Sequence, residues 1–227
     1  MRNIWALVVV MFLVIPALAQ RTETRQVRSF SGVSAAEGID VYLKKGDKEE
    51  VKVVVEGTDP SNIITEVSGS YLKVHRKDGR YPAGIDVQVF VTYVNVDKLS
   101  ASSAGSIFSD ETINAREMEI SASSAGTIEV TVEAGTLEVS SSSAGDVELK
   151  GRARVLSVVA ESAGEIDADE LDAEDVEAEA ASGGSVKVNV SQSLKAEASS
   201  AGSIRFRGNP DRSITNSSSG GSVRKSN

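Results

Sequence analysis

Most of the chain alternates between apolar and polar residues with a period of two, and this alternation recurs around a repeated Ser-Ala-Gly segment. Two residues after the last glycine of each copy stands an isoleucine or a valine: Ile107, Ile128, Val147, Ile166, Val186, Ile204 and Val223. The following residue is charged in every copy but the first, and the next one is mostly apolar again. This pattern is typical of a β-strand that buries one face. A second strand is predicted before each glycine, where Leu137 and Val139 are examples.

The glycines themselves define a repeat. They follow one another at intervals of 18 to 21 residues: Gly105, Gly126, Gly145, Gly164, Gly184, Gly202 and Gly221. A repeat of this length with small variations is typical of a coil whose straight segments are fixed while one corner varies in length. No segment has convincing helical periodicity. The sequence therefore predicts an all-β fold, a parallel β-helix or β-solenoid with about 19–20 residues per coil in its C-terminal part.

The Ser-Ala-Gly segment is expected to form a tight corner of each coil. The residue two before the glycine is serine in all seven copies, and the residue between them is alanine or glycine. Stacked coils bring equivalent residues about 4.8 Å apart, so only small side chains fit there. We expect the serine hydroxyls to bond to one another or to the backbone, and the glycine to supply the bend through a positive φ. A phosphate-binding loop is the alternative, but no helix signal and no GK[ST] motif follows.

The segment before the repeats also consists of short alternating stretches, bounded by Gly, Pro, Asp or Asn. It predicts less regular coils over residues 20–100, continuous with the regular repeats of 101–227. We therefore expect one β-solenoid domain over residues 20–227.

The first residues have the pattern of a secretory signal peptide, predicted to span residues 1–19. Arg2 precedes an apolar run from Ile4 to Ile15, and the small-residue site Ala17–Ala19 follows. A signal anchor is the alternative. The chain has no cysteine, which excludes disulfides and lipid attachment through cysteine. We expect an exported protein in the periplasm or on the cell surface, and not an integral membrane protein.

Several segments together resemble a known family. They are "VRSFSGVSAAEGIDVYLKKGDKEEVKVVVEG", "YLKVHRK", "DVQVFVTY" leading to "VDKLSASSAGSI", and "GNP" ahead of "SSSGGSV". With the repeated corners, they are similar to the exported bacterial GIN domain, described as the head of autotransporter adhesins. The resemblance implies a right-handed parallel β-helix and a role in adhesion. It implies no catalytic residues.

The formal net charge of −9 disfavours nucleic acid and anionic lipid surfaces as partners. The acidic run of residues 165–180 is interpreted as the outer face of one coil, partly neutralised by its neighbours. In the predicted alignment Lys150, Arg152 and Arg154 lie beside Glu170, Asp172 and Glu174, Asp167 lies beside Lys187, and Glu177 lies beside Lys195. A calcium site at Asp167 and Asp169 is the alternative, because carboxylates two apart on a strand point the same way.

The remaining candidate chemistry is sparse. A polysaccharide-processing site needs clustered carboxylates and cations, and Asp167, Asp169, Lys187 and Arg205 could form one. The single histidine, His75, is interpreted as an exposed strand residue. Tyr42, Tyr71 and Tyr81 could offer rings to a glycan. We predict no cofactor.

These observations favour a non-enzymatic exported protein that acts by binding a protein or glycan ligand, as an adhesin-like head. A structural or periplasmic scaffold that self-associates is the alternative, and a β-helix enzyme is a third possibility.

Overall fold

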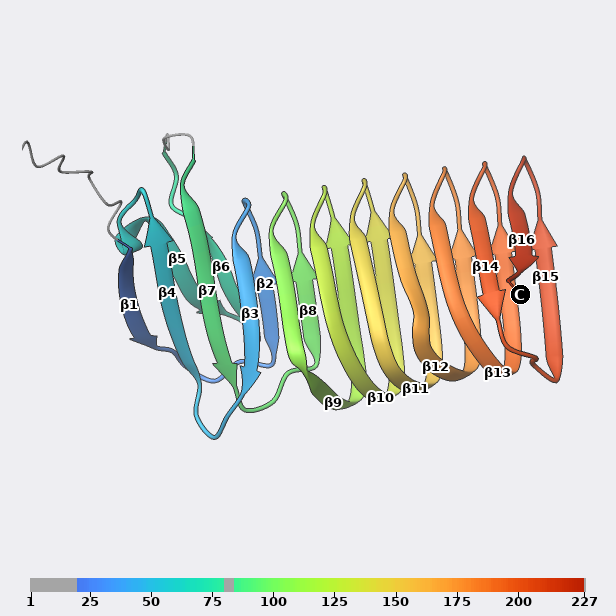
Figure 1. Ribbon diagram of the computed structural model, residues 1–227, viewed down its shortest axis with the longest axis horizontal. Coiled ribbons are helices and arrows are strands. Elements are labelled where there is room, and N and C mark those ends of the chain that lie inside the picture. Colours follow the sequence, from blue (N-terminus) through green and yellow to red (C-terminus); the bar gives the residue numbers. More distant parts are fainter. Residues whose placement is uncertain (1–19, 80–83, 227) are drawn as a thin grey trace, which may run out of the picture.

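The computed structural model describes residues 20–79 and 84–226, so the predicted signal peptide and Tyr81 lie outside the described residues. The described chain is almost entirely β-strand, apart from one 3-10 turn, η1 (Pro60–Asn62). The strands wind into a right-handed coil that advances along the long axis of the molecule (Figure 1). The predicted fold class, a parallel β-solenoid, is confirmed.

The regular coils form the C-terminal part. Their strands are β8 (Lys98–Ala101), β9 (Ser106–Ser123), β10 (Thr127–Ser142), β11 (Asp146–Ala160), β12 (Glu165–Ala180), β13 (Ser185–Ala198), β14 (Ser203–Arg207), β15 (Arg212–Ser217) and β16 (Ser222–Lys225). Each long strand turns near its middle, so a coil has two flat sides joined by a wide bend and by a tight corner (Figure 1).

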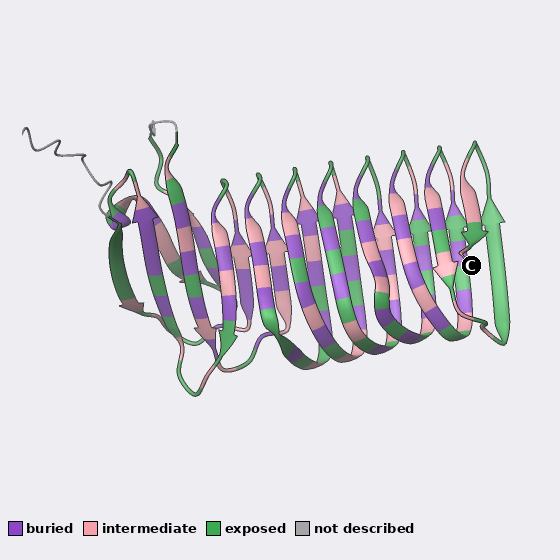
Figure 2. Cartoon of the chain, viewed as in Figure 1, coloured by how far each residue is buried: buried purple, intermediate pink, exposed green. Residues whose placement is uncertain are grey.

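The core lies between the two sides of the coils. β10 pairs in parallel with β9 and β11, which places Ile128 between Ile107 and Val147. These three residues are 0% exposed, and buried and exposed positions alternate along the strands (Figure 2). Each such side chain contributes about 1.5–3 kcal/mol on burial. The stacked aliphatic residues therefore hold the coils together.

The N-terminal part combines parallel and antiparallel strands. It contains β1 (Arg21–Gln26), β2 (Gly32–Ala35), β3 (Asp40–Lys45), β4 (Glu50–Glu56), β5 (Ile63–Ser68), β6 (Tyr71–Arg76) and β7 (Asp86–Tyr93). β2 and β3 run parallel to the following coil, where they pair with β8 and β9. β4 runs antiparallel to β1 and β7, and β5 runs antiparallel to β6. The antiparallel strands lie at the N-terminal end of the solenoid (Figure 1).

The tight corners are two-residue turns with positive φ at both central positions. In one of them Ser143 has φ 51° and Ala144 has φ 60°, and the N–H of Gly145 donates to the C=O of Ser142 at 2.9 Å. This is the geometry of a type I′ turn. Gly145 itself is not among the residues with positive φ, nor are its six equivalents. The expectation that this glycine supplies the bend through a positive φ is therefore wrong.

The repeated glycine is required for another reason. A Cβ on Gly126 would lie 2.4 Å from the C=O oxygen of Ala101 on the preceding coil. The same close approach to the preceding coil recurs at the equivalent glycines: Gly105, Gly145, Gly164, Gly184, Gly202 and Gly221. Glycine thus lets one coil lie directly on the last.

Backbone hydrogen bonds join the corners along the axis. The N–H of Ala125 donates to the C=O of Ser143 at 3.1 Å, and the N–H of Ala163 donates to the C=O of Ser182 at 3.2 Å. The corner serines are exposed, and in the described part of the chain their hydroxyls make no hydrogen bond. The expected bonding through serine hydroxyls is therefore wrong, and the backbone takes that role.

Candidate binding groove

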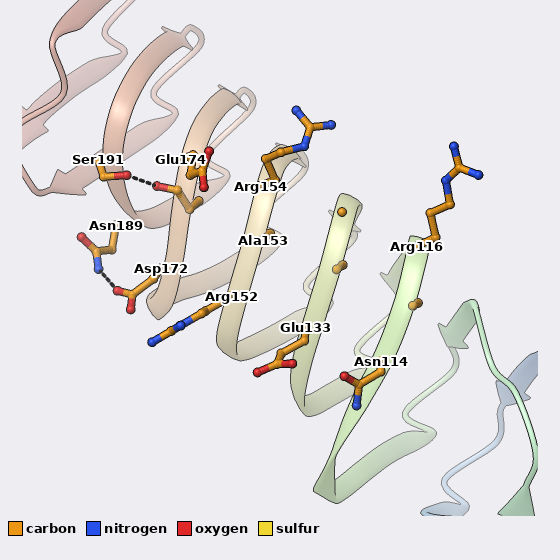
Figure 3. Close-up of a pocket in the computed structure, with 14 residues that line it drawn as sticks. Asn114, Arg116, Glu133, Arg152, Ala153, Arg154, Asp172, Glu174, Asn189 and Ser191 are labelled. Carbon is orange, nitrogen blue, oxygen red and sulfur yellow. Dashed lines mark hydrogen bonds between the residues drawn. The ribbon is translucent and has the colours of Figure 1, made fainter.

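The wide bend, on the other side of each coil from the corner, carries a groove of about 910 Å³. It crosses β9, β10, β11, β12 and β13, and we call it the bend groove (Figure 3). The register of the strands shifts in this region, for example between Ala168 and Asp172 of β12. The extra residues of the longer coils are therefore located near the bend. The sequence of the bend does not need to follow the strict repeat.

The floor of the bend groove is a row of alanines. Four of them stack in register from coil to coil: Ala115, Ala134, Ala153 and Ala173. Ala153 and Ala173 are each 3% exposed, and the other two pack against the core. Because alanine has a single methyl group, the floor is smooth and shallow along the axis.

Two rows of outward side chains flank this floor. The residues before the alanines form the first row, and those after them form the second (Figure 3). The first row is Asn114, Glu133, Arg152, Asp172 and Asn189, and the second is Arg116, Gly135, Arg154, Glu174 and Ser191. A Cβ on Gly135 would lie 2.7 Å from the C=O oxygen of Arg116. Glycine at this place leaves a gap between the two arginines of the second row.

Three arginines of the groove have no partner within the described residues. Arg116, Arg152 and Arg154 are exposed, and none forms an ion pair or a hydrogen bond. Figure 3 shows their side chains extending away from the ribbon. The carboxylates at the other end of the groove do have partners. Asp172 accepts a hydrogen bond from Asn189 at 2.8 Å, and Glu174 accepts one from Gln192 at 3.2 Å.

The charged residues predicted to lie side by side are register neighbours in the structure. Only some of these neighbours form ion pairs. Arg152 lies directly opposite Asp172 on the next strand, yet the two side chains form no ion pair. Lys150 does form ion pairs, with Glu148 at 3.0 Å and with Glu170 at 3.5 Å. The predicted neutralisation of Arg152 and Arg154 by the acidic coil is therefore wrong at the level of side chains.

The acidic residues proposed for calcium or catalysis lie outside the groove and have cationic partners. Asp167 contacts Lys187 at 2.8 Å, and Asp169 contacts Arg207 at 3.3 Å. The hydrogen bond to Asp167 is the main cause that raises the pKa of Lys187. Arg205 is the register neighbour of Lys187 on β14. Within residues 20–79 and 84–226, no group of three potential metal ligands is assembled.

The structure places the two described candidate tyrosines in packed surroundings. The ring of Tyr42 lies between those of Phe90 and Phe108, at centroid distances of 5.2 and 5.4 Å, so both of its faces are covered. Tyr71 packs against Gly32, where a Cβ would lie 2.7 Å from the ring. Burial raises the pKa of both phenols. His75 is half-buried, with Nδ1 2.9 Å from the C=O oxygen of Arg76.

The fold and the groove define a right-handed β-solenoid with a polar groove along one edge. Residues 29–210 match the family described as "Putative auto-transporter adhesin, head GIN domain", and the chain belongs to this family. This confirms the resemblance noted in the sequence. No curated protein matches the chain.

Solved structures share the whole fold at low sequence identity. One is a "putative adhesin" from Bacteroides fragilis, with 20% identity, a TM-score of 0.83, and coverage of 93% of this chain and 99% of that chain. A "putative lipid binding protein" from Parabacteroides distasonis has 19% identity, a TM-score of 0.69, and coverage of 92% and 97%. A "putative adhesin" from Parabacteroides merdae has 16% identity, a TM-score of 0.70, and coverage of 92% and 96%. In the described ranges, no helix has the length and apolar character needed to span a bilayer.

Proposed function

We propose that this protein is a non-enzymatic, exported protein of the cell envelope that binds its ligand in the bend groove. The observation that carries the proposal is that three exposed arginines line one groove and have no partner among residues 20–79 and 84–226. Membership of a family described as adhesin heads supports a binding role.

The contrast with the lysines makes these arginines informative. Lys98, Lys187 and Lys195 each contact a carboxylate on a neighbouring strand, at 2.7, 2.8 and 2.6 Å. Charges across neighbouring strands are thus used to stabilise the stack. The guanidinium groups of the groove keep their donors available, and their planar fork suits carboxylate, sulfate or phosphate groups.

The two acidic residues considered for catalysis from the sequence are not placed to act on a ligand in the bend groove. Glycoside hydrolysis requires two carboxyl groups on either side of one substrate bond. Asp167 and Asp169, the residues proposed for such a role, do not line the groove and form ion pairs with Lys187 and Arg207.

The absence of cysteine from the chain makes a direct test simple. A single cysteine at Glu133, in the groove, is labelled with a maleimide–polyethylene glycol, and a cysteine at exposed Glu129 on the same strand is the matched control. Binding is measured to immobilised dextran, polygalacturonate and dextran sulfate, and to vesicles of phosphatidylcholine and phosphatidylglycerol. We expect the label at 133 to abolish binding and the label at 129 to leave it unchanged. An affinity that is unchanged by the label at 133 would contradict the proposal.

A structural role is the second candidate, favoured by the C-terminal end of the solenoid. All six residues of β15 are exposed, β13 is the one partner of β15 among the described strands, and Ile214 is 53% exposed. An unpaired strand edge is a template for pairing with another chain. Sedimentation at micromolar concentration tests this role, since association that is lost in an Ile214→Lys variant would support a scaffold.

Location separates an adhesin from a periplasmic protein. We propose export to the cell surface or periplasm, and protease treatment of intact cells followed by an immunoblot distinguishes the two. Loss of the band from intact cells would support an adhesin. A band protected until lysis would favour a periplasmic binding or scaffolding role.

A further inference from the structure

We propose that the ligand of the bend groove is an acidic glycan chain that lies along the solenoid axis. This inference rests on the proposed function, because it assigns a chemical class to the ligand of that groove.

Arg152 and Arg154 place one guanidinium group on each side of the groove floor. They flank the floor residue Ala153 on a single strand, where residues two apart lie about 7 Å from each other. Their side chains extend outward on the two sides of the floor (Figure 3). A chain that lies over Ala153 can therefore place anionic groups against the guanidinium group on either side of it.

Arg116 offers a further guanidinium group along the same groove. It belongs to β9 and Arg154 to β11, so the two lie two coils, or about 10 Å, apart. Gly135 stands between them in the second row and leaves the path open. A linear polymer with anionic groups at intervals fits this arrangement better than a single small anion, because the groove continues over five strands.

The remaining lining distinguishes a glycan from other polyanions and from a lipid. Asp172, Glu174, Asn189 and Ser191 line the end of the groove beyond Arg154, and these groups suit the hydroxyls of a sugar. A densely charged chain such as a nucleic acid would meet three carboxylates along the groove, Glu133, Asp172 and Glu174, in a protein whose formal net charge is −9. The lining offers alanine as its apolar side chain, so an acyl chain would bury little apolar surface.

The test compares the binding of four probes: polygalacturonate, dextran sulfate, neutral dextran and phosphatidylglycerol vesicles. The variants are Arg152→Gln with Arg154→Gln, Arg116→Gln, and Arg224→Gln as a control that removes a positive charge from an exposed position outside the groove. Thermal unfolding of each variant shows that the fold is retained. Comparison of the carboxylated with the sulfated polymer identifies the anionic group.

We expect an acidic polymer to bind and neutral dextran and vesicles not to bind. The Arg152→Gln and Arg154→Gln double variant should weaken binding by about ten- to a hundredfold, since hydrogen bonds to charged groups are lost. Arg224→Gln should leave the affinity within about twofold. Glu133→Gln should strengthen binding by about two- to fivefold, because it removes a negative charge from the first row.

Other outcomes separate this inference from the proposed function. One outcome is that dextran or vesicles bind, that the label at 133 blocks this binding, and that the arginine variants leave it unchanged. The acidic glycan is then excluded as the ligand, but the groove remains the binding site. If an acidic polymer binds but neither the label nor the arginine variants reduce its affinity, both proposals fail. If neither acidic polymer binds, the assignment of an acidic glycan is overturned.

Discussion

The two ends of each coil reverse the chain in different ways. At the corner, every copy has the same turn, the same glycine and the same axial hydrogen bonds. At the bend, the register shifts, the outward residues differ from coil to coil, and the groove lies between them. The corner repeats the same close backbone contact in every coil, whereas at the bend such a contact occurs only in some coils, for example at Gly135. The outward side chains of the bend can therefore differ from coil to coil and serve a ligand.

The largest expected effect on stability comes from inserting one residue. The corner should tolerate the insertion much less than the bend. A glycine inserted between Ser143 and Ala144 should destabilise the protein by about 3 kcal/mol or more, because it breaks the turn and its axial hydrogen bonds. A glycine inserted between Asp169 and Glu170, where the register already shifts, should cost less than about 1 kcal/mol. Urea unfolding followed by circular dichroism measures both, and equal losses would contradict the distinction.

A smaller steric change tests the role of the corner glycine. In a Gly164→Ala variant the Cβ would lie 2.4 Å from the C=O oxygen of Ser141, so we expect a loss of about 3 kcal/mol. Gly183→Ala is the matched control. Gly183 has φ +79°, a Cβ there would meet nothing within 4 Å, and alanine occupies the equivalent place in other corners. The account requires Gly164→Ala to be clearly the more destabilising of the two in the same unfolding measurement.

The left-handed backbone of the corner predicts a stabilising substitution. Ala144 has φ 60°, a conformation that costs an alanine about 1–2 kcal/mol. Ala144→Gly removes this cost but adds about 0.4–1 kcal/mol of chain entropy, so the net gain should be about 0.5 kcal/mol. Ala134→Gly, at the bend and without a positive φ, should instead be destabilising. A melting temperature that falls in both variants would show that the corner alanine is not strained.

The smallest effect concerns a carboxyl group beside the corner. Burial, followed by the charges of Glu165 and Glu148, raises the pKa of Asp146. A raised pKa in the folded state means that the stability from this group is complete below the unfolded pKa and is lost as the pH rises through the folded one. Asp146→Asn should therefore stabilise the protein at pH 7, by less than about 0.5 kcal/mol, with no difference below pH of about 4. If the difference in unfolding free energy between the variant and the wild type grew as the pH fell, the pKa of Asp146 would be shifted in the opposite direction and this prediction would be wrong.

The periodic part of the fold could be predicted from the sequence. The alternation around Ile128 and Leu137 fixes which side chains face the core, and the repeated glycines fix which coils lie in register. The reason for the glycines could not be predicted, because a small residue is favoured equally by a positive φ and by a close backbone contact. The antiparallel direction of β4 and β5 was also not predictable, since alternation is the same for both directions of pairing.

The bend groove was missed for a related reason. Arg152 and Arg154 were expected to pair with the carboxylates of the next coil, because their register neighbours are acidic. Register determines which backbones are adjacent, but it does not determine where long side chains extend. The available signal was the alternation of small floor residues with charged ones, as in "RAR" of residues 152–154 and "DAE" of residues 172–174.

The most direct test of the central claim compares two affinities for polygalacturonate. One is measured with a labelled cysteine at position 133, and the other with a labelled cysteine at position 129. Both positions lie on β10, one in the groove and one on a flat side of the coil. The account predicts that only the label at 133 abolishes binding. Equal affinity of the two labelled proteins would contradict the claim that the bend is the binding face of this solenoid.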